Sequence, residues 1–113
     1  MIFGQIETRE ALANCNDIIT VEGVDGLFIG PSDLSVNLGI PGELSNPILL
    51  DAVAQVAAAG VSHKKATGII TSSMPLIASC KEKGMRLFSC GSETGMTIKR
   101  AKENVKEFKK LYS

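Results

Sequence analysis

Four short apolar runs, each followed by a segment with helical spacing, constrain the fold of this chain more than any other feature. The runs occupy residues 2–6, 26–29, 67–71 and 86–90. Each is too short for a helix and is bounded by turn formers or a charged residue, so each is predicted to be a strand. Strands and helices that alternate in this way are typical of α/β proteins, in which right-handed crossovers place helices over a parallel sheet. We therefore predict four β-α units built on one parallel sheet.

Helix signals fill the segments between these strands. A helix of about ten residues is predicted to begin at Thr8, a good N-cap residue. A second is predicted from Asn46, an N-cap followed by proline, to a glycine C-cap at Gly60. A third follows the serine pair at 72–73. The intervening stretch 32–47 is rich in turn formers and is predicted to be a loop.

The last segment has the pattern of an amphipathic helix. Lysines and an arginine lie between apolar residues that recur at steps of three and four. The apolar residues are Ile98, Ala101, Val105, Phe108 and Tyr112. A basic amphipathic helix can lie on a membrane, but Glu103 and Glu107 interrupt the basic face. We therefore favour a solvated outer helix over a membrane-surface element.

Composition excludes several classes of function. The 113 residues suit one domain, 1–113, and its 12 basic and 12 acidic residues leave no charge excess for nucleic acid. No apolar run reaches the roughly 20 residues needed to span a bilayer, and the N-terminus has no signal-peptide pattern, so a cytoplasmic protein is expected. The three cysteines, Cys15, Cys80 and Cys90, are widely spaced. They are predicted to be reduced and mostly buried thiols.

Two acidic residues mark the expected functional edge of the sheet. In parallel α/β folds, function collects where strands end and loops lead into helices. Glu7 follows the first strand, and Asp33 lies three residues beyond the end of the second. Consecutive strands are commonly neighbours, so these carboxylates are expected to converge. Their oxygens suit Mg²⁺ or Mn²⁺, although solvated polar residues at two strand ends are the alternative.

The turn Gly30-Pro31-Ser32-Asp33 adds a second element to this candidate site. A glycine-containing bend can aim successive backbone amides, here those of Ser32 and Asp33, at a carboxylate. Two carboxylates also balance the charge of a divalent ion, so the combination would favour a small oxyacid. An ordinary strand-to-loop turn remains the alternative on spacing alone.

A family resemblance joins these pieces. The stretches "QIETREAL" and "VEGVDGLFIGPSDLSVNLG", within residues 4–39, closely resemble the HpcH/HpaI aldolase family of metal-dependent pyruvate aldolases. The later stretches "ATGIIT" and "RLFSCGSETGM" resemble the last two strands of the family more loosely. The resemblance implies a TIM (β/α)₈ barrel, of which these four β-α units would form the C-terminal half.

The resemblance also implies residue roles. Glu7 and Asp33 correspond to the ligands of the divalent metal, and Gln5, Gly30, Ser32 and Asp33 to the positions that bind pyruvate or another 2-oxo acid. The implied reaction is that of a carbon-carbon lyase, which cleaves 4-hydroxy-2-oxo acids to pyruvate and an aldehyde. The metal polarises the keto group in that chemistry, so no Schiff-base lysine is required.

Parts of the family pattern have no counterpart in these residues. The first half of the family barrel supplies an arginine that clamps pyruvate and a His/Asp pair that moves protons. His63, the only histidine, is predicted to be an exposed loop residue, and Arg9, Arg86 and Arg100 are poorly placed for the clamp. Glu93 follows the last strand and is expected to cap the next helix, although it could reach the site.

A half barrel would expose two sheet edges and an apolar inner face. We therefore expect either a homo-oligomer or association with a complementing N-terminal half. The alternative to an aldolase is a noncatalytic half-barrel module or remnant that acts by association with another chain. A citrate-lyase-like enzyme acting on a CoA ester is a third interpretation, which the Gly-Pro-x-Asp-Leu-Ser turn disfavours.

Overall fold

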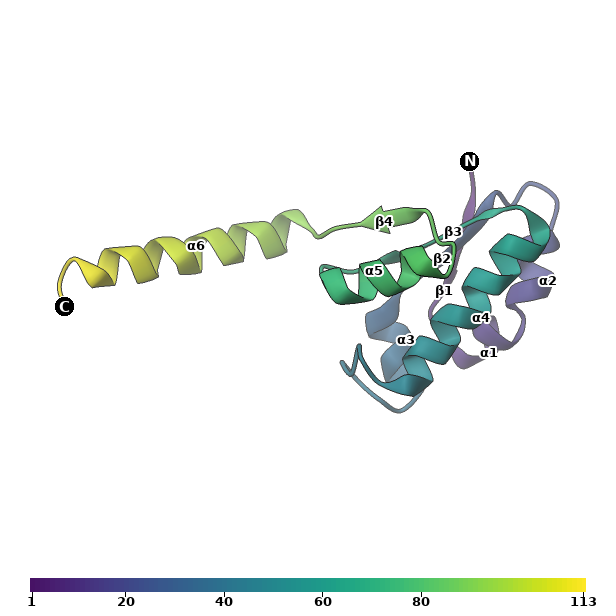
Figure 1. Cartoon of the computed structure of the whole chain (residues 1–113), viewed down its shortest axis with the longest axis horizontal. Coiled ribbons are helices and arrows are strands. Elements are labelled where there is room, and N and C mark those ends of the chain that lie inside the picture. The colour runs from purple at the N-terminus through teal and green to yellow at the C-terminus, as the bar shows by residue number, and fades with distance from the viewer.

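The computed structural model describes all residues, 1–113, and contains one four-stranded sheet (Figure 1). All three strand pairings are parallel, and the order in the sheet follows the order in the chain. The prediction of an α/β fold with four parallel strands is confirmed, with ends shifted by one residue in most strands. The strands are β1 Phe3–Ile6, β2 Gly26–Ile29, β3 Ala66–Ile70 and β4 Leu87–Ser89.

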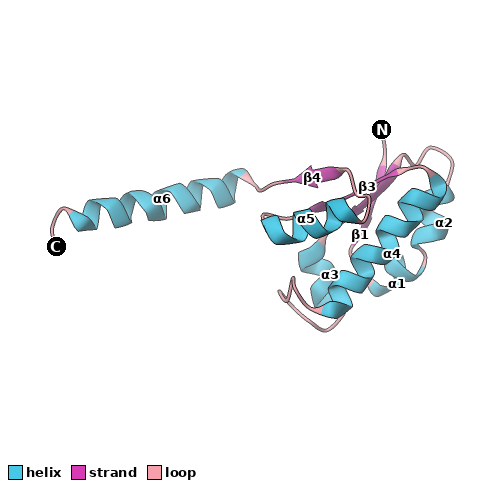
Figure 2. Cartoon of the chain, in the orientation of Figure 1, coloured by secondary structure: helices cyan, strands magenta, loops and turns pink.

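Six helices accompany the sheet (Figure 2). The predicted first helix is divided at Asn14, which ends one short helix and begins the next. The Thr8 and Asn46 side chains accept hydrogen bonds from backbone amides in the following turn, which confirms both as N-caps. The helices are α1 Arg9–Ala13, α2 Cys15–Thr20, α3 Pro31–Asn37, α4 Pro47–His63, α5 Met74–Glu82 and α6 Glu93–Lys110.

The core lies between one face of the sheet and the helices that cover it, with buried residues from α2, α3, α4 and α5. Successive strand residues point to opposite faces, and the buried strand side chains are those on the helix side. Ile6, Leu27, Ile29 and Ile69 are fully buried there. They pack with the apolar residues of α4 into a single cluster of 17 buried residues. This burial fixes which strand residues point to the opposite, inner face.

The inner face of the sheet has no helix over it. Phe3, Phe28 and Leu87 lie on this face and are only partly buried, and Ile70 is 42% exposed. A shallow hollow of about 400 Å³ runs over this face between β1 and β4. The exposed apolar inner face expected for half a barrel is therefore present.

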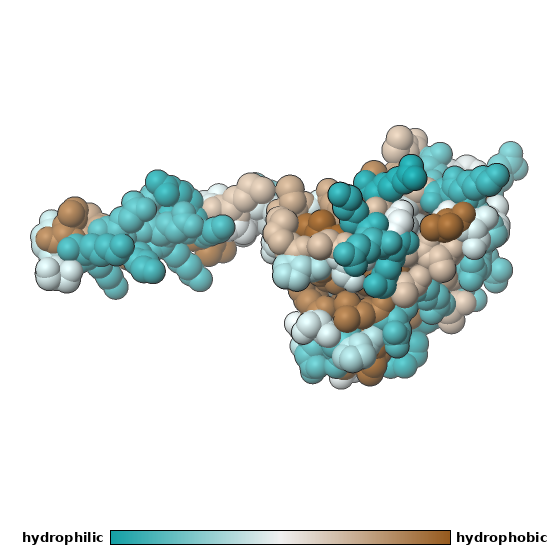
Figure 3. Space-filling view, in the orientation of Figure 1, coloured by the Kyte–Doolittle hydropathy of each residue, from teal (hydrophilic) through white to brown (hydrophobic).

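Helix α6 projects away from the rest of the molecule (Figure 1). It contains no buried residue, and Phe108 and Tyr112 are 59% and 78% exposed. The radius of gyration is 16.8 Å, against about 13 Å for a compact chain of this length. The amphipathic pattern is confirmed, and apolar side chains reach the surface of the helix (Figure 3). None of the six helices has both the length and the apolar character needed to cross a membrane.

Two local predictions are wrong. The stretch 32–47 begins with α3 rather than a continuous loop, because Leu34 and Ser35 are buried and hold this turn-prone segment in a helix. Helix α4 does not end at Gly60 but continues to His63, and Lys64 adopts the left-handed conformation with φ of 54°. Gly60 instead allows close packing, since a Cβ there would lie 2.5 Å from Cγ2 of Thr67 in β3.

Candidate functional site

The candidate site forms where β1 and β2 end. The two strands pair in parallel with Gln5 opposite Phe28 and Ile6 opposite Ile29. The Gly30 amide then donates a hydrogen bond of 3.2 Å to the Ile6 carbonyl. The ladder therefore extends one residue past β2 and fixes Gly30 beside the chain segment that carries Glu7.

Gly30 leaves the space that the Gln5 and Glu7 side chains share. A Cβ built on Gly30 would lie 2.8 Å from Nε2 of Gln5 and 3.3 Å from Oε2 of Glu7. Gln5 and Glu7 are two residues apart on an extended segment and so point to the same face. The structure thus brings together three of the residues predicted for the site, an amide, a carboxylate and a glycine without a side chain.

Ser32 and Asp33 lie in the first turn of α3, directly after this glycine. Gly30 is the N-cap and Pro31 occupies the first helical position, where a missing N–H costs nothing. The two side chains are exposed, whereas Pro31 is buried and anchors the turn. Pro31 therefore holds the first turn of α3 close to the end of β2.

A hydrogen-bonded network centred on Ser35 holds this turn in place. The Ser35 hydroxyl donates to the Ser32 carbonyl at 2.7 Å and accepts from the Gly42 amide at 3.0 Å. Ser35 itself is fully buried. The loop after α3 is therefore tied back to the segment that carries Ser32 and Asp33, a support that sequence reasoning did not identify.

The carboxylates of Glu7 and Asp33 are the charged oxygen donors that follow β1 and β2. The two ion pairs of the structure lie elsewhere, so neither Glu7 nor Asp33 is neutralised by a basic side chain. Carboxylate and carbonyl oxygens are the ligands that Mg²⁺ and Mn²⁺ favour. No group of three or more His, Cys, Asp or Glu residues converges to form a complete metal-binding cluster. Glu7 and Asp33 would therefore supply only part of a ligand set.

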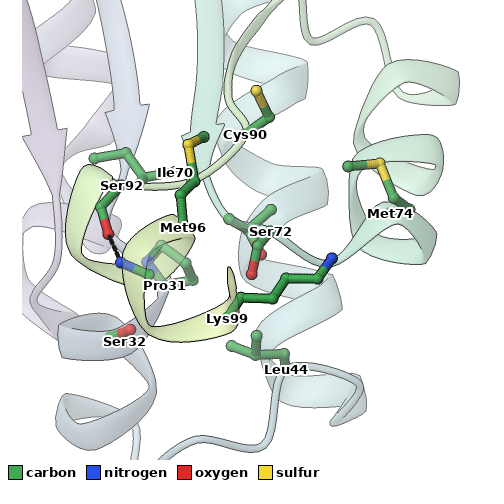
Figure 4. Close-up of a pocket in the computed structure, with 13 residues that line it drawn as sticks. Pro31, Ser32, Leu44, Ile70, Ser72, Met74, Cys90, Ser92, Met96 and Lys99 are labelled. Atoms are coloured by element: carbon green, nitrogen blue, oxygen red, sulfur yellow. Dashed lines mark hydrogen bonds between the residues drawn. The ribbon is translucent and has the colours of Figure 1, made fainter. Parts of the chain in front are cut away.

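A larger cavity lies beside this edge, at the carboxyl ends of β3 and β4 (Figure 4). Its volume is about 600 Å³, and Ser32 forms part of its wall together with Ile70, Ser72 and Cys90. Lys99 and Met96 reach it from the first turns of α6. Sequence reasoning identified the strand ends in this wall but missed Lys99, because an amphipathic pattern does not show which loop a helix begins beside.

The other polar residues considered from sequence lie away from these contacts. His63 is exposed in the last turn of α4, so its predicted exposure is confirmed but its predicted loop position is wrong. The Arg9 guanidinium donates to the Asn37 carbonyl at 3.2 Å. Glu93 is exposed in the first turn of α6, where Ser92 is the N-cap. None of these side chains replaces an arginine clamp or a proton-transfer pair.

Comparison with known proteins assigns the chain to a family. The model of the HpcH/HpaI aldolase/citrate lyase family matches residues 1–100. The chain is 39% identical over 101 residues to a 4-hydroxy-2-oxo-heptane-1,7-dioate aldolase of Salmonella paratyphi C. That match covers 86% of this chain and 37% of the relative. The chain thus spans little more than a third of the length of this curated relative.

Solved structures give the same result. An HpcH/HpaI aldolase from Desulfitobacterium hafniense superposes with a TM-score of 0.88 at 25% identity, covering 96% of this chain and 42% of that protein. A family protein from Burkholderia cenocepacia superposes with a TM-score of 0.85 at 28% identity, covering 95% and 42%. In both comparisons nearly all of this chain corresponds to less than half of the other protein.

Proposed function

The chain belongs to the HpcH/HpaI aldolase/citrate lyase family, and from this membership we propose that it forms part of a metal-dependent aldolase. The proposed reaction cleaves a 4-hydroxy-2-oxo acid to pyruvate and an aldehyde. Support comes from the Salmonella relative, a 4-hydroxy-2-oxo-heptane-1,7-dioate aldolase that is identical to this chain at 39% of the aligned residues. Because the chain spans 37% of that relative, the activity is proposed for an assembly that includes further β-α units.

One observation carries the proposal. Gly30 has no side chain where the Gln5 amide and the Glu7 carboxylate meet, and a Cβ would come within 2.8 Å of the amide. A simple polar strand end needs no such space, because its side chains would extend into water. The arrangement instead suits a small ligand held between strand ends.

Each residue has a proposed role in that site. Glu7 and Asp33 would hold Mg²⁺ or Mn²⁺, which supplies Lewis-acid polarisation of the keto group when bound. Gln5 would orient the oxyacid through its side-chain amide, and the amides of Ser32 and Asp33 would donate to its carboxylate. The N–H groups of a first helical turn have no acceptor within the helix, so they are free to donate to a ligand.

Proton transfer needs groups beyond those gathered at this edge. The side chains nearest to a Cβ built on Gly30 are Gln5 and Glu7, and neither is a basic residue. We therefore propose that the inner face of the sheet is covered by a second set of four β-α units, from another copy or from an N-terminal half. Such a partner would close both open edges and could add the missing groups.

Pyruvate release from a 4-hydroxy-2-oxo acid, with and without added Mn²⁺, tests the proposal. Glu7→Gln and Asp33→Asn should each abolish Mn²⁺-dependent release, because either change removes a charged ligand. Glu22→Gln is a matched control, since Glu22 is an exposed carboxylate in the turn before β2. Activity that survives both substitutions, or is equal without metal, would contradict the assignment.

The second candidate is a noncatalytic half-barrel module. It is favoured by the inner face and by α6, both of which expose apolar surface. Mn²⁺ binding that needs Glu7 and Asp33, without pyruvate release in any assembly state, would support the module. Light scattering over a range of concentrations would show whether the chain assembles with itself.

A further inference from the structure

Another hollow lies at the opposite end of the strands, where β3 and β4 begin. Its volume is about 480 Å³, within the usual range for small-molecule sites. The end of α4 and the turns before β3 and β4 form its wall, and Figure 1 shows α4 and α5 ending toward the same side of the molecule. We call it the basic hollow, and its residues are Gly60, Val61, Lys64, Lys65, Ala66, Gly84 and Arg86.

The wall of the basic hollow carries positive charge and no negative charge. Lys64, Lys65 and Arg86 are cationic, and none of the seven residues is acidic. The chain as a whole has 12 basic and 12 acidic residues, so this is a local concentration of charge. Glu82, the acidic residue closest to these three along the chain, does not line the hollow. Neither ion pair of the structure includes any of the three cations, so no carboxylate of the chain neutralises them.

The three cations are held in different ways. Nζ of Lys65 donates a hydrogen bond of 2.7 Å to the Ile19 carbonyl at the end of α2, so the position of this charge is fixed. Lys64 and Arg86 are exposed and come from different segments. The carbonyl groups at the end of α4 accept the backbone amides of Lys64 and Lys65, which covers the negative end of that helix. Lys64 and Arg86 therefore supply the cationic groups that can move to contact a ligand.

Lys64 also has a backbone conformation that favours glycine. Its φ is 54° and its ψ is 33°, and it is the only residue other than glycine with a positive φ in the chain. Helices commonly end on a glycine in this conformation, because a side chain there is strained. The chain uses glycine at its five other positions of positive φ. Strain of this kind is tolerated most often at functional positions, which favours a role for the Lys64 side chain.

We propose that the basic hollow binds a small dissolved compound that carries multiply charged phosphate. Phosphate oxygens accept charge-assisted hydrogen bonds from guanidinium and ammonium groups, and an ion with several negative charges can contact both. β3 runs from Ala66 in this hollow to Ile70 in the cavity at the other end of the strand. Its five residues, at about 3.3 Å each, separate the two by roughly 13 Å. The phosphate site is therefore distinct from the proposed metal and oxyacid site, and its ligand is an effector and not a substrate.

Pyrophosphate and inorganic phosphate test the site by calorimetry on the full chain. The buffer contains no divalent metal, so pyrophosphate cannot bind through a metal at Glu7 and Asp33. Pyrophosphate should bind at least about fivefold more tightly than phosphate because it carries more charge, and added salt should weaken both. Vesicles of phosphatidylcholine and phosphatidic acid in equal parts should not sediment the chain, because Val61 is the only large apolar side chain of the hollow.

Three substitutions assign the binding to the basic hollow. Lys64→Gln and Arg86→Gln each remove one charge from an exposed side chain, and each should weaken pyrophosphate binding about fivefold. Glutamine at position 64 has the same backbone strain as lysine, so urea unfolding should show little change in stability. Lys102→Gln is the matched control, since Lys102 is an exposed lysine of α6 outside the hollow, and it should leave the affinity unchanged.

Four results would overturn the proposal. They are no binding of pyrophosphate by the full chain, affinity that survives both Lys64→Gln and Arg86→Gln, an equal loss in Lys102→Gln, and sedimentation with the vesicles in place of pyrophosphate binding. An equal loss in the control would mean that general surface charge attracts the ion. Each of these results would leave the proposed aldolase function intact, because that function is tested by metal-dependent pyruvate release.

Discussion

Gly30→Ala tests the candidate site by adding one methyl group to it. The new Cβ would lie 2.8 Å from Nε2 of Gln5 and 3.3 Å from Oε2 of Glu7. Non-bonded atoms prefer separations of about 3.5 Å or more, so the Gln5 amide must withdraw by roughly 0.7 Å. Displacements of this size are enough to disrupt a preorganised site. Because Gln5 is proposed to orient the oxyacid, we expect the dissociation constant for pyruvate, measured with Mn²⁺ present, to increase about tenfold.

The same substitution should barely affect stability. The clashing atoms are the ends of flexible side chains, and the φ of −94° at Gly30 is accessible to alanine. Replacing glycine also restricts the unfolded chain, which stabilises by about 0.4 to 1 kcal/mol. The free energy of unfolding in urea should therefore change by less than about 1 kcal/mol.

Gly68→Ala provides the contrasting control. A Cβ on Gly68 would lie 2.2 Å from the Leu87 carbonyl oxygen, a backbone atom of the neighbouring strand. β3 and β4 would have to separate, at a cost of about 3 kcal/mol or more. Unchanged pyruvate affinity in a stably folded Gly30→Ala variant would refute the site. A loss of stability as large as in Gly68→Ala would refute the reasoning about side-chain freedom.

Two further predictions concern the core. Leu49→Ala removes a fully buried side chain of α4 and should lower the free energy of unfolding, measured by urea titration, by about 2 to 5 kcal/mol. Ile48→Ala, at a position 51% exposed, should change the same free energy by less than about 0.5 kcal/mol. Burial raises the pKa of the Cys80 thiol from its ordinary value of 9.0, against a smaller opposing effect of Lys83. Only the unfolded chain then loses this proton just above pH 9, so the free energy of unfolding should fall as the pH rises from there. Cys80→Ala should remove that part of the decline, whereas Cys90→Ala should keep it.

The strands and the helix caps could be predicted from sequence because their signals are local. Apolar runs of four or five residues with turn formers at their ends give the strands, and Thr8 and Asn46 cap helices by contacts within three residues. Helix α3 could not be predicted in this way. Its residues favour turns, and its stability depends on the burial of Leu34 and on the hydrogen bond between Ser35 and Gly42.

The candidate site was predictable in part for a similar reason. Parallel pairing carries the ends of consecutive strands to one edge, so Gln5 and Glu7 could be placed near Gly30 without coordinates. The ligand roles of Glu7 and Asp33 stay predictions. The cavity and Lys99 depend on where α6 leaves β4, and no residue pattern within α6 encodes that direction.

The location of the site on the sheet links the proposed chemistry to assembly. Gln5 and Glu7 belong to β1, which is an edge strand with a partner on one side only. Any further unit that completes a barrel must pair with that edge or with β4, and must cover the inner face on which Phe3 and Phe28 are partly exposed. A unit that pairs with β1 would lie directly beside Glu7. The groups that hold a ligand and the surface that takes a partner are thus adjacent, so assembly would add ligands and exclude water at the same edge.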